Sequence, residues 1–242
     1  MRCPCLPTWF GGLAAAACVV TADAQPDLEG FWTPRLEQAR SGQALIDELP
    51  DGVVLINDTG AGELAAGDFG GLKLTPAAIE EVRRYDFAAE LSRENTCNAP
   101  TAAFLMQAPF PMEVYQSDRL IVFRMEYFDL VRVVFLDGRA HPPATAPHSR
   151  VGHSVGRWEG DTLVVDTTHL TAGTFMNNGF NHSEGLHMTE RFRLGPDGTV
   201  LWLVQIYEDS AVFDGVAARY MAFTRRPGEY VYPYDCDPSY GE

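Results

Sequence analysis

Lysine is almost absent from this chain of 242 residues, since Lys73 is the only one. Schiff-base chemistry would depend on that single residue in a loop-like segment, and we do not expect it. Basic residues are scarce as a group, with 18 against 33 acidic ones, and the formal net charge is −15. Such a charge repels nucleic acids and anionic membranes, so neither is an expected partner.

The chain also lacks an apolar run long enough to span a bilayer, which takes about 20 apolar residues. Its most apolar stretch, residues 6–20, is interrupted by Pro7 and by the pair Gly11-Gly12. With a basic residue before it and an Ala-x-Ala pattern at residues 22–24 after it, this stretch has the form of a secretory signal peptide over residues 1–24. We therefore expect a periplasmic or secreted protein with no membrane attachment after cleavage; a retained anchor is the alternative.

Cysteine is scarce as well, because cleavage would leave only Cys97 and Cys236. In an oxidising compartment we expect these two to form a disulfide. A catalytic cysteine is the alternative, but neither residue has a histidine or a glycine-rich turn beside it in the sequence. About 218 residues would remain, which suits a single domain with one core.

The first part of the mature chain, residues 25–111, is rich in proline and turn signals. Thr75 as N-cap and Pro76 as first helical residue predict one helix, and the apolar pattern carries it to about Ser92. Three prolines argue against regular structure between residues 97 and 111.

From residue 112 onward the chain consists of runs rich in β-branched and aromatic residues, which favour strands. Turn signals at residues 137–138, 159–161 and 196–198 predict hairpins between them. Consecutive antiparallel strands protect their edges best when the sheet closes. We therefore predict a mainly β fold over residues 112–242, an antiparallel up-and-down, calycin- or lipocalin-like barrel or a strongly bent sheet. One peripheral helix and the rest of residues 25–111 pack on it within the same single domain. The predicted strands are residues 112–125, 130–136, 150–158, 162–169, 186–194, 199–208 and 218–225.

Strand alternation places Glu190 on the same face as Met188 and Phe192. A carboxylate on an apolar face would have its pKa raised toward the range useful for acid–base catalysis. The alternative is a buried ion pair that only stabilises the core. Three arginines on neighbouring strands could supply its partner, namely Arg124, Arg132 and Arg219.

Several other polar residues stand on predicted strands or in a turn. His153 and Asp166 lie on strands, where His153 could act as acid or base and Asp166 could orient a histidine. A hydrogen-bonded core histidine is the alternative for His153. Further candidates are Tyr127 as a phenolic donor and Arg132 and Arg139 as anion stabilisers. Arg139 and His141 could also recognise or protonate a carbonyl, phenol or carboxylate of the substrate.

A cluster of two histidines and a carboxylate, His182, Glu184 and His187, could ligate a divalent metal. The spacing fits no familiar metal motif, and on a strand His182 and His187 would point to opposite faces. We therefore favour solvated loop histidines over a metal site, which stays the alternative, and we expect no organic cofactor.

Residues 152–167 read Gly-His-Ser-Val-Gly-Arg-Trp-Glu-Gly-Asp-Thr-Leu-Val-Val-Asp-Thr. The first five residues match the Gly-x-Ser-x-Gly pattern of serine hydrolases, but the flanks of Ser154 predict strand, turn and strand where a nucleophile elbow needs a helix. Together with residues 27–34, 131–142 and 182–192, this run resembles a family of secreted, uncharacterised bacterial proteins. The resemblance implies an exported single domain and transfers no catalytic residues.

Three functions fit these observations. The favoured one is an exported, cofactor-independent acid–base enzyme, a lyase, isomerase or cyclase, that acts on a small, partly apolar or aromatic molecule. Its expected site brings His153, Asp166 and Glu190 together across the barrel. A non-catalytic barrel that binds a small ligand is the second, and a metal-dependent hydrolase built on His182 the third. Homo-oligomerisation stays open.

Overall fold

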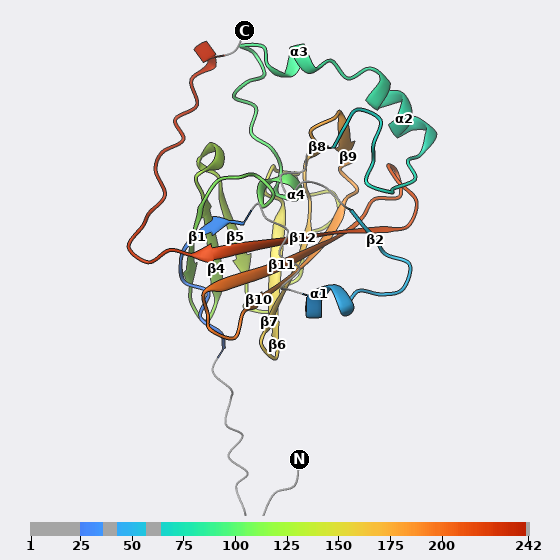
Figure 1. Cartoon of the computed structure of the whole chain (residues 1–242). Coiled ribbons are helices and arrows are strands. Elements are labelled where there is room, and N and C mark those ends of the chain that lie inside the picture. The colour runs from blue at the N-terminus through green and yellow to red at the C-terminus, as the bar shows by residue number, and fades with distance from the viewer. Residues whose placement is uncertain (1–24, 36–42, 57–63, 241–242) are drawn as a thin grey trace, which may run out of the picture.

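The computed structural model describes residues 25–35, 43–56 and 64–240. The expected signal peptide, residues 1–24, lies outside the described residues. Nine strands close into a barrel in the order β1-β3-β4-β5-β6-β7-β10-β11-β12, and β1 pairs back onto β12 (Figure 1). The strands are β1 (Gly30–Pro34), β3 (Met112–Gln116), β4 (Leu120–Met125), β5 (Val131–Phe135), β6 (His153–Glu159), β7 (Thr162–Thr168), β10 (His187–Leu194), β11 (Val200–Glu208) and β12 (Val216–Arg225).

The barrel predicted from the sequence is confirmed, with one difference in strand direction. Neighbouring barrel strands are antiparallel except β5 and β6, which pair in parallel through Val134 and Ser154. The hairpin expected at residues 137–138 is therefore wrong, because the chain leaves β5 there and returns through residues 136–152 to enter β6 in the same direction. The hairpins expected at Gly160 and Gly198 are confirmed, and both glycines have positive φ, which a tight turn requires.

The N-terminal segment supplies the strand that closes the barrel. Trp32 of β1 is fully buried, and its indole N–H donates to the carbonyl oxygen of Leu28. The short strand β2 (Val54–Leu55) pairs in parallel with β12 outside the closed ring, and α1 (Gln43–Asp47) packs on the outer face of β11 and β12 through the buried Leu45.

Two expectations for the helices need correction. The helix predicted from Pro76 to about Ser92 is interrupted: α2 (Pro76–Arg83) begins at the Thr75 cap as predicted, and α3 (Phe87–Glu90) begins anew because the Asp86 side chain accepts from the amides of Ala88 and Ala89. The proline-rich segment contains the short helix α4 (Ala102–Leu105). A hairpin, β8 (Gly173–Met176) with β9 (Phe180–His182), and two 3₁₀ turns, Tyr127–Asp129 and Pro238–Tyr240, complete the fold. Among the described residues no helix is long and apolar enough to cross a membrane.

Side chains from opposite walls meet inside the barrel. The rings of Phe123 on β4 and Phe192 on β10 stack with their centroids 5.2 Å apart. The main apolar cluster also contains the fully buried Leu163, Val165 and Leu203. At this level the barrel interior is a packed core rather than an open lumen.

The expected disulfide is present between Cys97 and Cys236, whose Cα atoms are 5.8 Å apart. It fastens the end of the C-terminal strap, residues 226–240, to the segment between α3 and α4. Figure 1 shows the strap running from the end of β12 along the outside of the barrel toward α3. Its backbone is also held by carboxylates, since Asp129 accepts from the amides of Tyr234 and Asp235.

Candidate functional site

Strand alternation divides the candidate residues between the two faces of the barrel wall. Glu190 and Arg132 point inward and are almost completely buried, as predicted for Glu190. His153 and Asp166 lie on the outer face, although Asp166 pairs in register with Thr189, the direct neighbour of Glu190. The expected meeting of His153 and Asp166 with Glu190 therefore does not occur, because adjacent residues of a strand point to opposite sides.

The inner group is a saturated ion pair. Arg132 donates to both carboxylate oxygens of Glu190, and its Nη1 lies 2.9 Å from Oε1. The remaining donors of Arg132 reach Ser154 Oγ at 3.1 Å and Thr167 Oγ1 at 2.8 Å. Gln205 donates to Glu190 Oε1 at 2.9 Å. This geometry matches the buried ion pair that the sequence left open, and it places Ser154 inside a strand as a hydrogen-bond partner rather than on a nucleophile elbow.

The outer group is centred on Asp166, and we call it the histidine site: His141, His153, Asp166, Thr168 and His187. Asp166 Oδ1 accepts from His141 Nε2 at 2.7 Å, and Oδ2 accepts from His187 Nε2 at 2.6 Å. The two histidines reach the carboxylate from different elements, because His187 begins β10 and His141 lies in the connection between β5 and β6.

The hydrogen bonds determine where protons sit in this site. An ionised Asp166 accepts only, so the Nε2 atoms of His141 and His187 both carry a proton. A neutral His141 then has a bare Nδ1, which lies 2.9 Å from His153 Nδ1 and 3.0 Å from Thr168 Oγ1. His153 in turn stacks on Phe135, with the ring centroids 5.5 Å apart.

Two histidines of this site have pKa values shifted in opposite directions. The hydrogen bond to Asp166 raises the pKa of His187, and the charge of Glu208 adds to this effect. Burial lowers the pKa of His153, assisted by the nearby His141. For Asp166 itself burial opposes ionisation, but the hydrogen bonds from His187 and His141 prevail and lower its pKa. The site thus holds one histidine with a raised pKa, His187, and one with a lowered pKa, His153.

A pocket of about 480 Å³ opens beside this site. Four of the six histidines of the chain line it, together with apolar groups such as Leu186 and Pro142. His169 has a left-handed backbone (φ 59°), which is costly for a non-glycine residue and is typical of functional sites. Its ring is fixed by Thr168 Oγ1 at 2.8 Å and by the carbonyl oxygen of Pro143 at 3.0 Å. The lining histidines are His141, His148, His169 and His187.

Two further candidates lie elsewhere. Arg139 pairs with Asp137, and its guanidinium lies 3.7 Å from the centre of the Phe135 ring. It therefore contacts the same Phe135 ring on which His153 stacks, and it is not among the residues that line the pocket. Tyr127 stacks on Phe110 near the C-terminal strap, with the centroids 4.6 Å apart.

The three residues considered as metal ligands do not converge. His182 is buried, where its Nε2 lies 2.6 Å from Thr101 Oγ1 and burial lowers its pKa. His187 binds Asp166, and Glu184 lies at the pocket wall. Within the described part of the chain no group of three or more His, Cys, Asp or Glu side chains is arranged to hold a metal ion.

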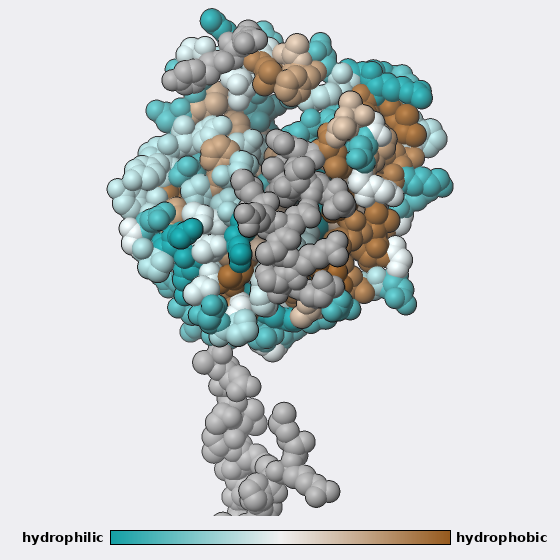
Figure 2. All heavy atoms as spheres, viewed as in Figure 1, coloured by the Kyte–Doolittle hydropathy of each residue, from teal (hydrophilic) through white to brown (hydrophobic). Residues whose placement is uncertain are grey.

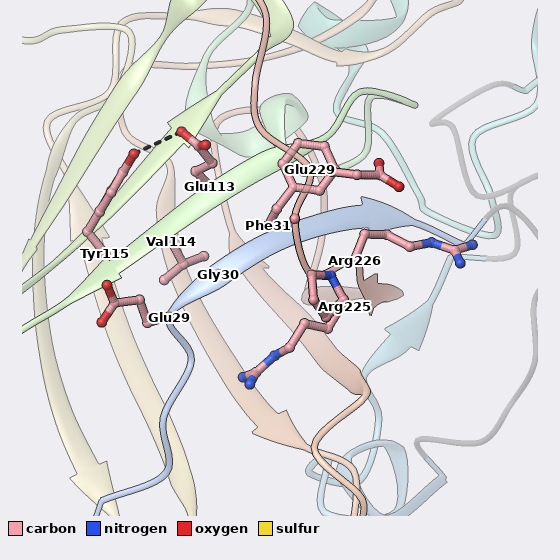
Figure 3. A pocket seen from close by; sticks show the side chains of 11 residues that line it. Glu29, Gly30, Phe31, Glu113, Val114, Tyr115, Arg225, Arg226 and Glu229 are labelled. Atoms are coloured by element: carbon pink, nitrogen blue, oxygen red, sulfur yellow. Dashed lines mark hydrogen bonds between the residues drawn. The ribbon is translucent and has the colours of Figure 1, made fainter.

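A different pocket, of about 380 Å³, lies over β1 and β3 beneath the start of the C-terminal strap (Figure 3). Two of its polar side chains satisfy each other. Figure 3 shows Tyr115 and Glu113 turned toward each other, and Glu113 also accepts from Arg124 at 2.8 Å. The histidine site is therefore the stronger candidate for chemistry.

The contact between His187 and Asp166 was not predicted from the sequence. Thr168, His148 and His169 were not predicted to belong to a site at all. The available signal was that Asp166 and His187 fall on faces of predicted strands that also carry polar residues. Comparisons with models of known protein families and with curated proteins found no match for this chain.

Proposed function

We propose that this protein is an exported acid–base enzyme of the lyase or isomerase type that acts on a small, partly apolar molecule at the histidine site. One observation carries the proposal: the two oxygens of Asp166 each bind the Nε2 of a histidine, and both histidines line one pocket. An Asp–His pair of this kind fixes the tautomer and orientation of the imidazole. Export rests on the sequence of residues 1–24, and the disulfide fits an oxidising compartment.

The opposite tuning of the histidines suggests their roles. His187 has a raised pKa, and its Nδ1–H, whose nitrogen lies 3.6 Å from Glu208 Oε1, is the acid that protonates a substrate carbonyl oxygen. The pair His141 and His153, in which burial lowers the pKa of His153, provides the base that removes a proton from the adjacent carbon. The substrate then forms an enol, and return of a proton at a different carbon gives an isomer. If the carbon next to the enol double bond carries a leaving group, that group departs with its bonding electron pair while the enol O–H proton returns to His187, which gives the unsaturated carbonyl product of a lyase reaction.

Arg132 and Glu190 have no part in this proposal, because each neutralises the other in the core. The alternative functions have less support. A ligand inside the barrel would have to displace Phe123 and Phe192, which touch across it. A hydrolase with a metal on His182 would need that histidine to leave its buried position beside Thr101.

The test is exchange of carbon-bound hydrogen for deuterium in D₂O, followed by NMR over a panel of small neutral ketones and aldehydes. Wild-type protein should accelerate exchange for at least one compound, and Asp166→Asn and His187→Gln should each slow it by about 10²–10⁴-fold. Arg157→Gln is the control, because Arg157 is exposed on β6 and pairs only with Glu159 among its described ion-pair partners. The proposal fails if the wild type accelerates no exchange, or if both histidine-site variants match it.

A further inference from the structure

A larger cavity, about 570 Å³, lies beyond one end of the barrel, and we call it the end cavity. It is enclosed by α3, α4, the turn Tyr127–Asp129 and the β8–β9 hairpin (Figure 1). None of its described lining residues lines the pocket of the histidine site. In Figure 2 a gap in the surface is visible at this end, beneath the brown side chains over α3.

Aromatic rings and neutral amides make up most of its wall. Glu90 is the one charged side chain among the described residues that line it. Aromatic side chains next to a few well-placed polar groups are typical of sites for small molecules, and a volume of several hundred Å³ suits one. The rings are Tyr85, Phe87, Phe104, Tyr127 and Phe128, and the amides are Asn95, Asn98, Asn177 and Asn181.

One wall is held in a costly conformation. Phe128 has a left-handed backbone (φ 55°), which is rare for a bulky residue, and Asp129 continues it (φ 53°). Phe128 packs on Tyr234 of the C-terminal strap, with the centroids 4.7 Å apart, and Tyr127 meets the same ring edge-on. The disulfide fastens Cys236, two residues after Tyr234, to Cys97, whose neighbours Thr96 and Asn98 line the cavity.

Another part of the wall exposes apolar surface to water. Phe87 is 59% exposed and Leu91 44% exposed, although both line the cavity. A ligand that covers exposed apolar groups beside a preformed cavity lowers the free energy, because it removes apolar surface from water.

We infer that the end cavity is a second binding site, for a small neutral molecule that combines an apolar ring with hydroxyl groups. The rings provide stacking surface. Asn95, Asn98 and Asn181 each use one end of the amide in a bond within the protein, which leaves the other end for a ligand. The lining disfavours an anion, because Glu90 repels it and none of the described lining residues is basic. The amides carry no net charge and match neutral hydroxyl groups.

Phenyl β-D-glucopyranoside is a probe of this chemistry, and its binding can be followed by isothermal calorimetry. Wild-type protein should bind it, and Phe87→Ala should weaken binding about fivefold through loss of one stacking partner. Tyr230→Ala is the matched control, because Tyr230 is 58% exposed and lies outside the cavity. Its Kd should equal that of the wild type.

Phenyl phosphate, with the same ring and a negative charge, should bind more weakly than the glucoside. His187→Gln should leave glucoside binding unchanged, which separates this site from the proposed catalysis. Three results would each overturn the inference: no binding of the glucoside at about 10 mM, equal binding by Phe87→Ala and wild type, or tighter binding of the phosphate. A Kd of ~10 mM corresponds to a binding free energy of about −2.7 kcal/mol, at the limit of useful recognition.

Discussion

Asp166 and Glu190 are two carboxylates on neighbouring strands, and their surroundings give them opposite roles. Glu190 is enclosed with Arg132 and has every oxygen satisfied inside the barrel. Asp166 is partly exposed and holds two histidines, one of them with a raised pKa. A carboxylate matters for chemistry when the groups that it holds can still reach a ligand, and only Asp166 meets that condition.

The buried pair of Arg132 and Glu190 leads to a prediction about stability. Arg132→Met should lower the free energy of unfolding by about 3–5 kcal/mol, because it leaves the charge of Glu190 buried without its partner. The double variant Arg132→Met/Glu190→Leu removes both charges, so its free energy of unfolding should fall clearly less than that of the single variant. Urea unfolding at neutral pH measures both, and a single variant as stable as the wild type would contradict the pairing.

Among the elements, the connection between β5 and β6 is decisive for the histidine site. It carries His141 and His148 from the end of β5 back over the outer face of β6 and β7. A tight hairpin at residues 137–138 would have directed the same residues away from Asp166. The parallel pairing of β5 with β6 is therefore what assembles the site.

The C-terminal strap is the second element with a testable role. The disulfide closes a loop with a sequence separation of 139 residues, so it restricts the unfolded chain strongly. The variant Cys97→Ser/Cys236→Ser should lose about 2–4 kcal/mol of stability, measured by urea unfolding without reductant. Wild-type protein in the presence of a reductant should approach the variant. Equal stability of variant and oxidised wild type would show that the bond does not constrain the chain.

At the scale of the whole molecule, the titration of the histidine site links its chemistry to stability. His187 has a raised pKa in the folded state. Its contribution to the free energy of unfolding is therefore complete below its pKa in the unfolded chain, about 6.5, and is lost as the pH rises through its pKa in the folded protein. Asp166 has a lowered pKa in the folded state. Its contribution to the free energy of unfolding is therefore complete above its pKa in the unfolded chain, about 3.9, and is lost as the pH falls through its pKa in the folded protein.

The stability difference between wild type and Asp166→Asn should therefore be larger at about pH 5.5 than at about pH 8.5. Urea unfolding at the two pH values measures it. Arg157→Gln, which changes an exposed charge outside the site, should show no comparable trend. A difference that grows toward pH 8.5 would contradict the assigned protonation of His187.

Much of the fold could be predicted because it depends on local patterns. Alternation placed Glu190 with Met188 and Phe192, Gly160 and Gly198 marked true hairpins, and the two remaining cysteines pair. The break between α2 and α3 was missed because Asp86 caps a new helix at a point where the apolar pattern continues.

The candidate site was predicted only in part. His153 and Asp166 were identified as single residues, but their partners come from segments far away in the sequence. His187 reaches Asp166 because β10 pairs with β7, and His141 arrives through an irregular connection that carries no periodic pattern.

The sequence by itself determined which residues share a face of each strand, where tight turns form and which cysteines can pair, because these are properties of the backbone period and of short segments. Only the tertiary structure decided which face lies inside the barrel and which histidines meet Asp166. Those outcomes depend on how β1 closes the sheet and on the direction in which β5 and β6 pair, and both are set by contacts between segments that are distant in the chain.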